Sequence, residues 1–218
     1  FQEAHASARK SIDQRNCVPL LVGGTGLYVR GVVDGLTPPP RFPEIAEQLE
    51  ADPETELLHR RLADLDPIGA SRMENNNRRR IIRALEVTLG TGRPFSSFGP
   101  GLNSYPQVPY RILGIEIERS ELDERIERRY RDQMEAGFLD EVRGLAEIEL
   151  SVTASQALGY KELLAHIRGQ TPLDEALQLA IQRTKRFARR QQRWFKRDPR
   201  VEWVPRSQLT SVINEISS

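Results

Sequence analysis

The sequence predicts an α/β protein with a parallel sheet, and three features indicate this class. Val18–Val22 is a short apolar run that ends at two glycines, and Arg111–Glu118 is a second apolar run, so both suit buried strands. Helical patterns separate the two runs, an order typical of a parallel sheet flanked by helices. Thr37–Pro43 is rich in proline and precedes purely helical patterns. We therefore expect a core of residues 1–42 and 96–218 with a helical insertion domain of residues 43–95.

The expected helices follow from the spacing of apolar residues. Residues 1–16 place Ala4, Ala8 and Ile12 on one face, and Gly26 opens a helix that continues towards Val33. In the expected insertion domain, leucines and isoleucines at helical spacing predict helices around residues 45–65 and 76–89.

Helix-start signals divide the second half of the chain. Ser120 is expected to cap a helix that carries an apolar stripe and ends near Gly137, and residues 138–145 resume as a second helix. Thr171 is expected to cap an unbroken helix that reaches about Arg197, and Val201–Val204 suits a last short strand. The apolar stripe consists of Leu122, Ile126, Tyr130 and Met134.

Composition excludes several classes of protein. The 32 basic residues almost cancel the 31 acidic residues, so a nucleic-acid signal must come from where the charges lie. A single cysteine, Cys17, excludes an internal disulfide framework and a Cys-rich zinc site, and we expect its thiol to be buried beside the apolar run. No stretch reaches the length of a membrane span, so we expect a cytoplasmic protein without a membrane partner.

Gly23-Gly24-Thr25-Gly26 is the first candidate site. Two glycines let the backbone approach a ligand closely, and the N-terminus of the following helix attracts negative charge. The alternative is a tight turn in which Thr25 is only a helix cap. The motif is not a Walker A loop, because no Lys-Ser/Thr pair follows its last glycine.

Basic residues form the other candidates. Arginines at 78, 79, 80 and 83 open a helix whose dipole they oppose, which favours contact with a phosphate backbone over stability alone. The alternative is a solvated basic face. The segment 183–197 contains eight basic residues and no acidic residue, and like-charge repulsion would destabilise it in isolation. A polyanionic partner explains it better than solubility does, and we expect its aromatic residues, Phe187 and Trp194 among them, to be core anchors.

The segment 121–131 interleaves arginines with acidic residues, and most of these are expected to be surface ion pairs. One inward arginine would suit a diphosphate, but spacing alone does not select it.

Taken together, these segments resemble the tRNA dimethylallyltransferase family. The matching blocks, in family order, are PLLVGGTGLYVRGVVDGL, LHRRLADLDPIGASRMENNNRRRIIRALEVTLGTGRPFS, LDERIERRYRDQMEAGFLDEVRGL, ASQALGYKELLAHIRG and TKRFARRQQRWFKRD. The resemblance covers nearly the whole chain. It implies a P-loop-type core of the kind that binds ATP and other nucleotides, and a helical insert that grips the tRNA anticodon arm.

The implied reaction transfers a dimethylallyl group from dimethylallyl diphosphate to the N6 amine of adenosine 37, with Mg2+. No protein partner is implied. The resemblance assigns catalysis to Thr25, which would lie beside the amine, and substrate binding to Gly23, Gly24, Arg129 and, as the fallback for the diphosphate, Arg125. It assigns tRNA contact to these residues: Arg79, Arg80, Arg83, Gln156, Gly159, Tyr160, Lys161, Arg189, Arg190, Gln191, Arg193 and Lys196.

The sequence also departs from the family pattern. Asn77 stands where Asp is common, and Arg193 stands where Thr is common. The family's N-terminal Gly-rich loop with its Lys, and the Asp that acts as base, have no counterpart in this sequence, which begins inside a predicted helix. We therefore expect the 218-residue chain alone to transfer no dimethylallyl group.

Two other functions remain open at this point. An adenylate isopentenyltransferase would use a free nucleotide, for which the basic segments would be unnecessary. A catalytically incompetent fragment that binds tRNA would retain the basic segments without the chemistry.

Overall fold

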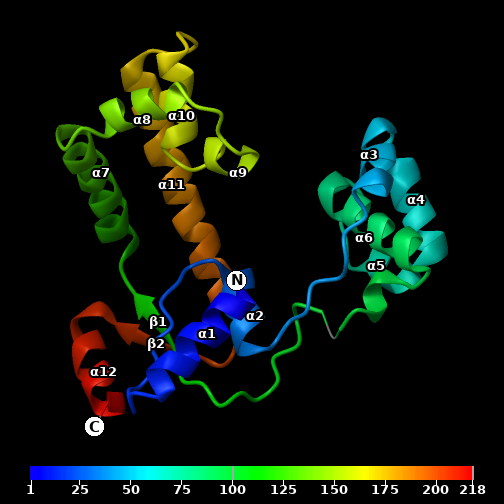
Figure 1. Ribbon diagram of the computed structural model, residues 1–218, viewed down its shortest axis with the longest axis horizontal. Coiled ribbons are helices and arrows are strands. Elements are labelled where there is room, and N and C mark those ends of the chain that lie inside the picture. Colours follow the sequence, from blue (N-terminus) through cyan, green and yellow to red (C-terminus); the bar gives the residue numbers. More distant parts are fainter. Residues whose placement is uncertain (100, 218) are drawn as a thin grey trace. The chain divides into compact units, whose positions relative to one another are not determined.

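The computed structural model describes residues 1–99 and 101–217 and separates into two compact units (Figure 1). The first unit comprises Phe1–Ser11 and Leu27–Pro109, and the second comprises Ile12–Gly26 and the chain from Tyr110 onward. Each unit contains an apolar cluster of its own.

The first unit is helical. Its residues form most of α1 (Gln2–Asp13) and α2 (Gly26–Val33), and all of α3 (Pro43–Ala51), α4 (Thr55–Leu65), α5 (Pro67–Ser71), α6 (Arg78–Thr91) and the 3-10 helix η1 (Phe95–Ser97). All of α3–α6 falls within residues 43–95. That these residues are a separate domain that contacts tRNA stays a prediction.

Helix α6 is the centre of the apolar cluster in this unit. Ile81, Ala84 and Leu85 are fully buried and lie with Leu58 and Leu62 of α4. The predicted period of apolar residues in this segment is confirmed. The helix ends at Gly92, whose backbone has a φ of 68°, a left-handed conformation that glycine adopts without strain.

The proline-rich linker is attached to α6. Its Phe42 N–H donates to Glu86 Oε1 at 2.7 Å, and Arg83 Nη2 donates to Pro39 O at 2.7 Å. The ring of Phe42 lies where a side chain at position 90 would be, so Gly90 makes this packing possible. Burial opposes ionisation of Glu86, but the hydrogen bonds from Phe42 and Arg83 outweigh it and lower its pKa.

A buried carboxylate joins α5 to η1. Asp66 is 1% exposed; its Oδ1 accepts from Gly69 N at 2.8 Å and from Ser96 Oγ at 2.6 Å, and its Oδ2 accepts from Ser96 N at 2.7 Å. Burial alone would raise the pKa of Asp66, but these hydrogen bonds outweigh that effect and lower the pKa below its ordinary value of 3.8. Asp66 is therefore ionised at neutral pH, and its carboxylate links the start of α5 to η1.

The second unit combines helices with a small sheet. Its elements are β1 (Ile112–Glu116), α7 (Arg119–Glu135), α8 (Phe138–Ala146), α9 (Val152–Ser155), α10 (Tyr160–Ile167), α11 (Leu173–Phe195), β2 (Val201–Pro205), the 3-10 helix η2 (Arg206–Gln208) and α12 (Leu209–Ser217). Helices α7, α8, α10 and α11 pack around one apolar cluster (Figure 1). The predicted stripe on α7 is confirmed: Ile126 and Tyr130 are buried in that cluster, and Leu122 and Met134 pack against it.

A parallel sheet is present, as predicted, but the strands that form it differ in part from expectation. β1 pairs with β2 in parallel register, with Ile112 opposite Val201 and Glu116 opposite Pro205. The strands predicted at 111–118 and 201–204 are therefore confirmed. The result is a helix-rich α/β fold with a small parallel sheet, while the P-loop-type core stays a prediction.

The prediction of a strand at Val18–Val22 is wrong. These residues lie outside helices and strands, and the side chain of Val22 is 84% exposed. A strand requires hydrogen bonds to a neighbouring strand, and no described segment pairs with this run. The preceding Cys17 is exposed rather than buried, with its thiol 3.5 Å from Arg15 O.

Other local predictions also fail. α7 begins after Glu118 and α11 after Pro172, and neither N-terminus has a side-chain cap, so Ser120 and Thr171 are not the caps that we expected. The aromatic residues of α11 are not core anchors, since Phe187 is 37% exposed and Trp194 only half-buried. The face of α1 expected to be apolar contains no buried residue. Across the described residues, no helix has the length and apolarity needed to cross a membrane.

Replacing Asp66 with Asn should lower the free energy of unfolding by about 1–3 kcal/mol at neutral pH, because buried hydrogen bonds to a charged group are weakened. The pKa of Asp66 is lowered in the folded state, so its contribution is complete above about pH 4 and is lost as the pH falls through the folded-state pKa. Urea unfolding from neutral to acidic pH measures both effects. Asp64→Asn, at an exposed position of α4, is the matched control and should change little. Equal acid sensitivity of D66N and the unsubstituted protein would contradict the assignment.

Candidate functional site

The glycine turn of residues 23–26 lies directly against α11. A Cβ atom on Gly24 would lie 2.5 Å from Gln191 Nε2, and one on Gly26 would overlap the indole of Trp194. Only glycine therefore allows the backbone to approach the helix this closely. Thr25 stands between the two glycines and is exposed, which leaves its hydroxyl accessible at the surface of the turn. The turn thus brings the predicted catalytic residue beside the predicted tRNA-binding helix.

One flank of α11 is neutralised by α7. Lys185 Nζ donates to Glu127 Oε1 at 2.6 Å, and Arg189 Nη2 donates to Asp123 Oδ2 at 3.2 Å. Asp123 is only 24% exposed at its side chain, so this pair is partly shielded from solvent. Arg189, predicted to contact tRNA, has therefore a structural partner that its sequence position does not reveal.

Another face of α11 presents arginines to solvent. With about 100° between successive residues of a helix, Arg186, Arg190 and Arg193 fall within about 60° of one another. All three are exposed, and among the described residues none of them forms an ion pair; the guanidinium of Arg190 lies 5.8 Å from the centre of the Phe187 ring. We call these three residues the arginine stripe.

The arginine stripe lies between the two other faces of the helix. The ion-paired Lys185 and Arg189 are about 60–100° to one side of it, and Gln191 and Trp194, which meet the glycine turn, are about 80–140° to the other side. Thr25 and the arginine stripe are therefore on adjacent surfaces of one unit. Lys196 is exposed beyond the end of the helix, with its Nζ 5.8 Å from the Trp203 ring centre.

The two arginines predicted to hold diphosphate are both on α7. Arg125 and Arg129 are exposed, one helical turn apart, and Arg125 Nη1 lies 3.8 Å from Glu121 Oε1. Within the part of the chain that the structure describes, no hydrogen bond or ion pair joins either arginine to the glycine turn. Their role in holding the diphosphate stays a prediction.

The turn between α9 and α10 contains the next group of predicted tRNA contacts. Lys161 Nζ donates to Gln156 Oε1 at 2.7 Å, and the Tyr160 hydroxyl donates to Glu141 Oε1 at 2.8 Å. This hydrogen bond to Glu141 raises the pKa of Tyr160. Gln156 and Lys161 are exposed and Gly159 is buried, so the turn has an outer polar side and an inner packed side. We call residues 156–161 the recognition turn.

The arginines at the start of α6 belong to the first unit and divide into two kinds. Arg78 is structural: its guanidinium donates to Thr55 Oγ1 at 3.2 Å and to the carbonyls of Glu50 and Asp52. Arg83 is held by the linker and lies 2.8 Å from Glu86 Oε1, while Arg79 and Arg80 are exposed. Of the predicted tRNA contacts in this segment, Arg79 and Arg80 have the more accessible guanidinium groups.

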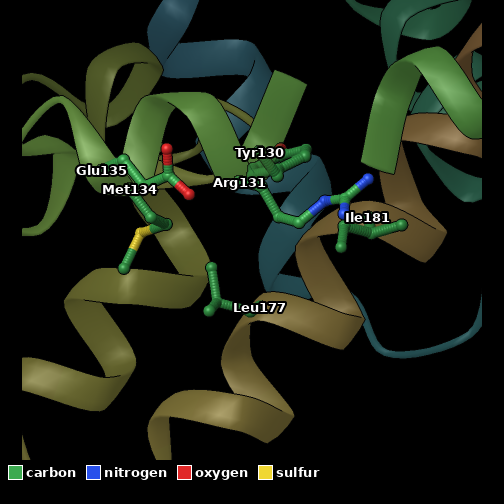
Figure 2. A pocket seen from close by; sticks show the side chains of 6 residues that line it. All are labelled: Tyr130, Arg131, Met134, Glu135, Leu177 and Ile181. Atoms are coloured by element: carbon green, nitrogen blue, oxygen red, sulfur yellow. The ribbon is translucent and has the colours of Figure 1, made fainter. Parts of the chain in front are cut away.

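A cavity of about 220 Å³ lies between α7 and α11, but it contains none of the predicted site residues. Figure 2 shows Leu177 and Ile181 of α11 facing Met134 and Arg131 of α7, with Tyr130 and Glu135 completing the lining. Its walls are mainly apolar side chains. The cavity is therefore separate from the site that the sequence predicts.

Within residues 1–99 and 101–217, no three side chains of His, Cys, Asp or Glu come close enough together to hold a metal ion. Mg2+ usually takes only one or two carboxylates and binds the rest of its ligands from substrate phosphates and water.

Sequence reasoning missed one buried carboxylate next to the recognition turn. Glu162 is 3% exposed; its Oε2 accepts from Gly159 N at 2.9 Å, and its Oε1 pairs with Arg183 of α11. The signal was present, because a Glu three residues after a helix N-cap is the second half of a capping box. The Arg183 partner, in contrast, could not be read from spacing.

Comparison with known proteins identifies relatives along most of the chain. The family described as IPP transferase matches residues 1–198. The tRNA dimethylallyltransferase of Streptomyces griseus is 45% identical over 205 residues, which cover 90% of this chain and 65% of that protein. This chain therefore spans less than two thirds of the length of that relative.

Solved structures agree with the fold. The full-length tRNA isopentenylpyrophosphate transferase of Bacillus halodurans is 31% identical with a TM-score of 0.64, over 99% of this chain and 71% of that one. A eukaryotic dimethylallyltransferase acting on tRNA has a TM-score of 0.73 at 21% identity, over 94% of this chain and 55% of that one, and supports the fold alone.

Gly26→Ala should separate the glycine turn from α11, because the added methyl group would overlap the Trp194 indole. Overpacking of this kind costs about 1–3 kcal/mol, which a thermal melt would report, and tryptophan fluorescence should shift as Trp194 becomes more exposed. Gly31→Ala is the matched control on the same helix, α2. A Cβ at position 31 meets open space, so this substitution should stabilise the helix slightly. If G26A melts like the unsubstituted protein with unchanged fluorescence, the close approach is not essential.

Proposed function

The chain belongs to the IPP transferase family, and we propose that it transfers a dimethylallyl group from dimethylallyl diphosphate to the N6 amine of adenosine 37 in tRNA. Its relative from Streptomyces griseus carries the name tRNA dimethylallyltransferase. Because the chain spans 65% of that relative's length, the activity of the whole protein is part of the proposal.

The observation that carries the proposal is the arrangement of α11. This helix presents the arginine stripe on one face and meets the glycine turn on the adjacent face. A stripe of unpaired guanidinium groups suits the phosphates of a nucleic acid, since cations there displace condensed counterions. An enzyme that modifies one base of a polyanion needs its catalytic groups beside such a surface, and the position of Thr25 in the glycine turn, which lies against α11, supports this role.

In the proposed reaction, the adenine N6 nitrogen forms a bond to C1 of the dimethylallyl group while the bond from C1 to the diphosphate oxygen breaks. The N6 amine loses one proton to a base, and the diphosphate leaves with the bonding electron pair. Thr25 would orient the amine through its hydroxyl. The target base must leave the anticodon stack to reach it, and backbone contacts to the arginine stripe would hold the RNA while this occurs.

The leaving diphosphate requires positive charge. Arg129, with Arg125 as the alternative, would meet its oxygens, since guanidinium groups bind phosphates through paired hydrogen bonds. We expect Mg2+ to accompany the diphosphate and neutralise part of its charge. The P-loop-type nucleotide-binding core and a cytoplasmic location complete the proposal.

Two assays on the same samples separate this function from the alternatives. Filter binding of tRNA together with transfer of a labelled dimethylallyl group to tRNA or to free AMP should give binding and transfer to tRNA only. Transfer to AMP alone would indicate an adenylate isopentenyltransferase. Binding without transfer in the natural full-length protein would indicate an RNA-binding module.

Thr25→Ala should reduce the rate of transfer about 100-fold in the natural full-length protein, because the amine would lose the hydroxyl that orients it for attack and misplacement of a reacting group has an effect of this size. Affinity for tRNA should change far less, because the phosphate contacts remain. Thr25→Ser, which keeps a hydroxyl, should retain most of the rate. Single-turnover kinetics measures the chemical step, and a normal rate in T25A would reduce Thr25 to a helix cap.

Neutralising the arginine stripe should weaken binding of all tRNAs about equally, because phosphate contacts contain little sequence information. In the variant with Arg186, Arg190 and Arg193 changed to Gln, the slope of log affinity against log salt should flatten by about 2–3, at 0.7–0.9 per lost contact. Affinity measured at several salt concentrations gives this slope.

The control variant changes Lys185 and Arg189 to Gln. These residues pair with Asp123 and Glu127, so this variant should lose thermal stability while its salt slope changes less. Identical slopes for the stripe variant and the unsubstituted protein would defeat the RNA-contact role of the stripe.

A further inference from the structure

Glu162 is a buried carboxylate that the proposed reaction does not use, and it lies beneath the recognition turn. Its side chain is 1% exposed. The two oxygens have different partners: Oε2 accepts from Gly159 N at 2.9 Å, and Oε1 pairs with the guanidinium of Arg183. A buried carboxylate that has a partner on each oxygen is held in one position, so it can in turn hold the backbone N–H that donates to it.

The backbone that Glu162 holds has a conformation that few residues could adopt. Gly159 has a φ of +87° and is buried. A Cβ on Gly159 would lie 3.1 Å from the Tyr130 hydroxyl and 3.2 Å from Phe138 Cζ, so the turn is pressed against α7 and α8. The inner side of the recognition turn is therefore held by this packing and by the hydrogen bond to Glu162, in addition to the backbone bond from Lys161 N to Ala157 O.

The surface behind Gly159 is itself fixed. Thr184 donates its only hydroxyl proton to Ala180 O at 2.8 Å, so the Tyr130 hydroxyl must be the donor in the 2.9 Å bond between Tyr130 and Thr184. A phenol keeps its proton near neutral pH, and burial raises the pKa of Tyr130 further. Arg183 and Thr184 are neighbours on α11, so this one helix supports both Glu162 and Tyr130.

The outer side of the turn displays polar groups. Lys161 Nζ is bonded to Gln156 Oε1 at 2.7 Å, and Tyr160 packs edge-on against Phe138 with its ring centre 5.0 Å away. The positions of the Tyr160 and Lys161 side chains depend on the backbone conformation at Gly159, which directly precedes them. We propose that Glu162 is a positioning residue: through its hydrogen bond to the Gly159 N–H it sets the recognition turn in the conformation that meets tRNA, an inference that rests on the proposed function.

Two variants separate the hydrogen bond from the charge. Glu162→Gln keeps the length of the side chain, so its amide oxygen can still accept from Gly159, but it loses the negative charge facing Arg183. Glu162→Asp keeps the charge but withdraws the carboxylate by one methylene from the Gly159 N–H. If Glu162 acts by positioning the turn, E162D should raise the KM for tRNA about tenfold, the effect of one lost bond to a charged group. E162Q should stay near the unsubstituted value.

The KM for dimethylallyl diphosphate and the kcat should change little in both variants. Val142→Ala is the matched control: Val142 is fully buried in the same apolar cluster, so V142A should lower the melting temperature without affecting the KM for tRNA. Backbone amide exchange of residues 157–163 should accelerate in E162D but not in E162Q or V142A.

The outcomes distinguish this inference from the proposed function. If the unsubstituted natural protein neither binds nor modifies tRNA, the proposed function fails, while amide exchange still tests whether Glu162 orders the turn. If E162D binds tRNA like the unsubstituted protein, or if V142A loses as much affinity as E162D, Glu162 is a stability residue and the inference is overturned. The same holds if E162Q loses as much as E162D, because E162Q can still accept from the Gly159 N–H and this hydrogen bond would then not be what sets the affinity for tRNA.

Discussion

Two carboxylates of α7, Asp123 and Glu127, accept hydrogen bonds from Arg189 and Lys185 of α11, and this contact decides which basic groups of α11 remain available to a ligand. A helix with six basic residues in its last fifteen positions would repel itself along its length. The two ion pairs remove that repulsion on one flank and leave the arginine stripe in solvent on the next. The same two helices also share a buried apolar cluster and the buried hydrogen bond between Tyr130 and Thr184.

Charge neutralisation therefore divides the basic residues into structural and available groups. In the first unit, Arg78 is occupied by carbonyls at the end of α3 and Arg83 by the proline-rich linker. Arg79 and Arg80, between them in sequence, are exposed. The guanidinium groups available to a polyanion are those for which the surrounding fold offers no carbonyl or carboxylate.

Glycines determine how closely two backbone segments at the candidate site approach the helices. Gly24 and Gly26 let the turn lie on Gln191 and Trp194, and Gly159 lets the recognition turn lie on Tyr130 and Phe138. In both places a backbone segment that bears candidate functional groups is pressed onto the helices α7, α8 and α11. This close packing positions exposed side chains on short irregular segments, which would otherwise be mobile.

The sequence by itself determined the longer helices, the presence of a parallel sheet and the family resemblance, but not the short α5 and α9 or the C-terminal α12. Apolar residues at helical spacing located α6 and the stripe of α7, and the family motifs located the candidate residues, because both depend on local order along the chain. The strand at Val18–Val22 failed because a strand exists only through its neighbour. Likewise, the sequence predicted a positive surface on α11 but not which arginines form it. Only the tertiary structure decided that Arg189 pairs with Asp123 and that Arg183 pairs with Glu162. The partners are 66 and 21 residues apart in the sequence, so they meet only after the helices have packed.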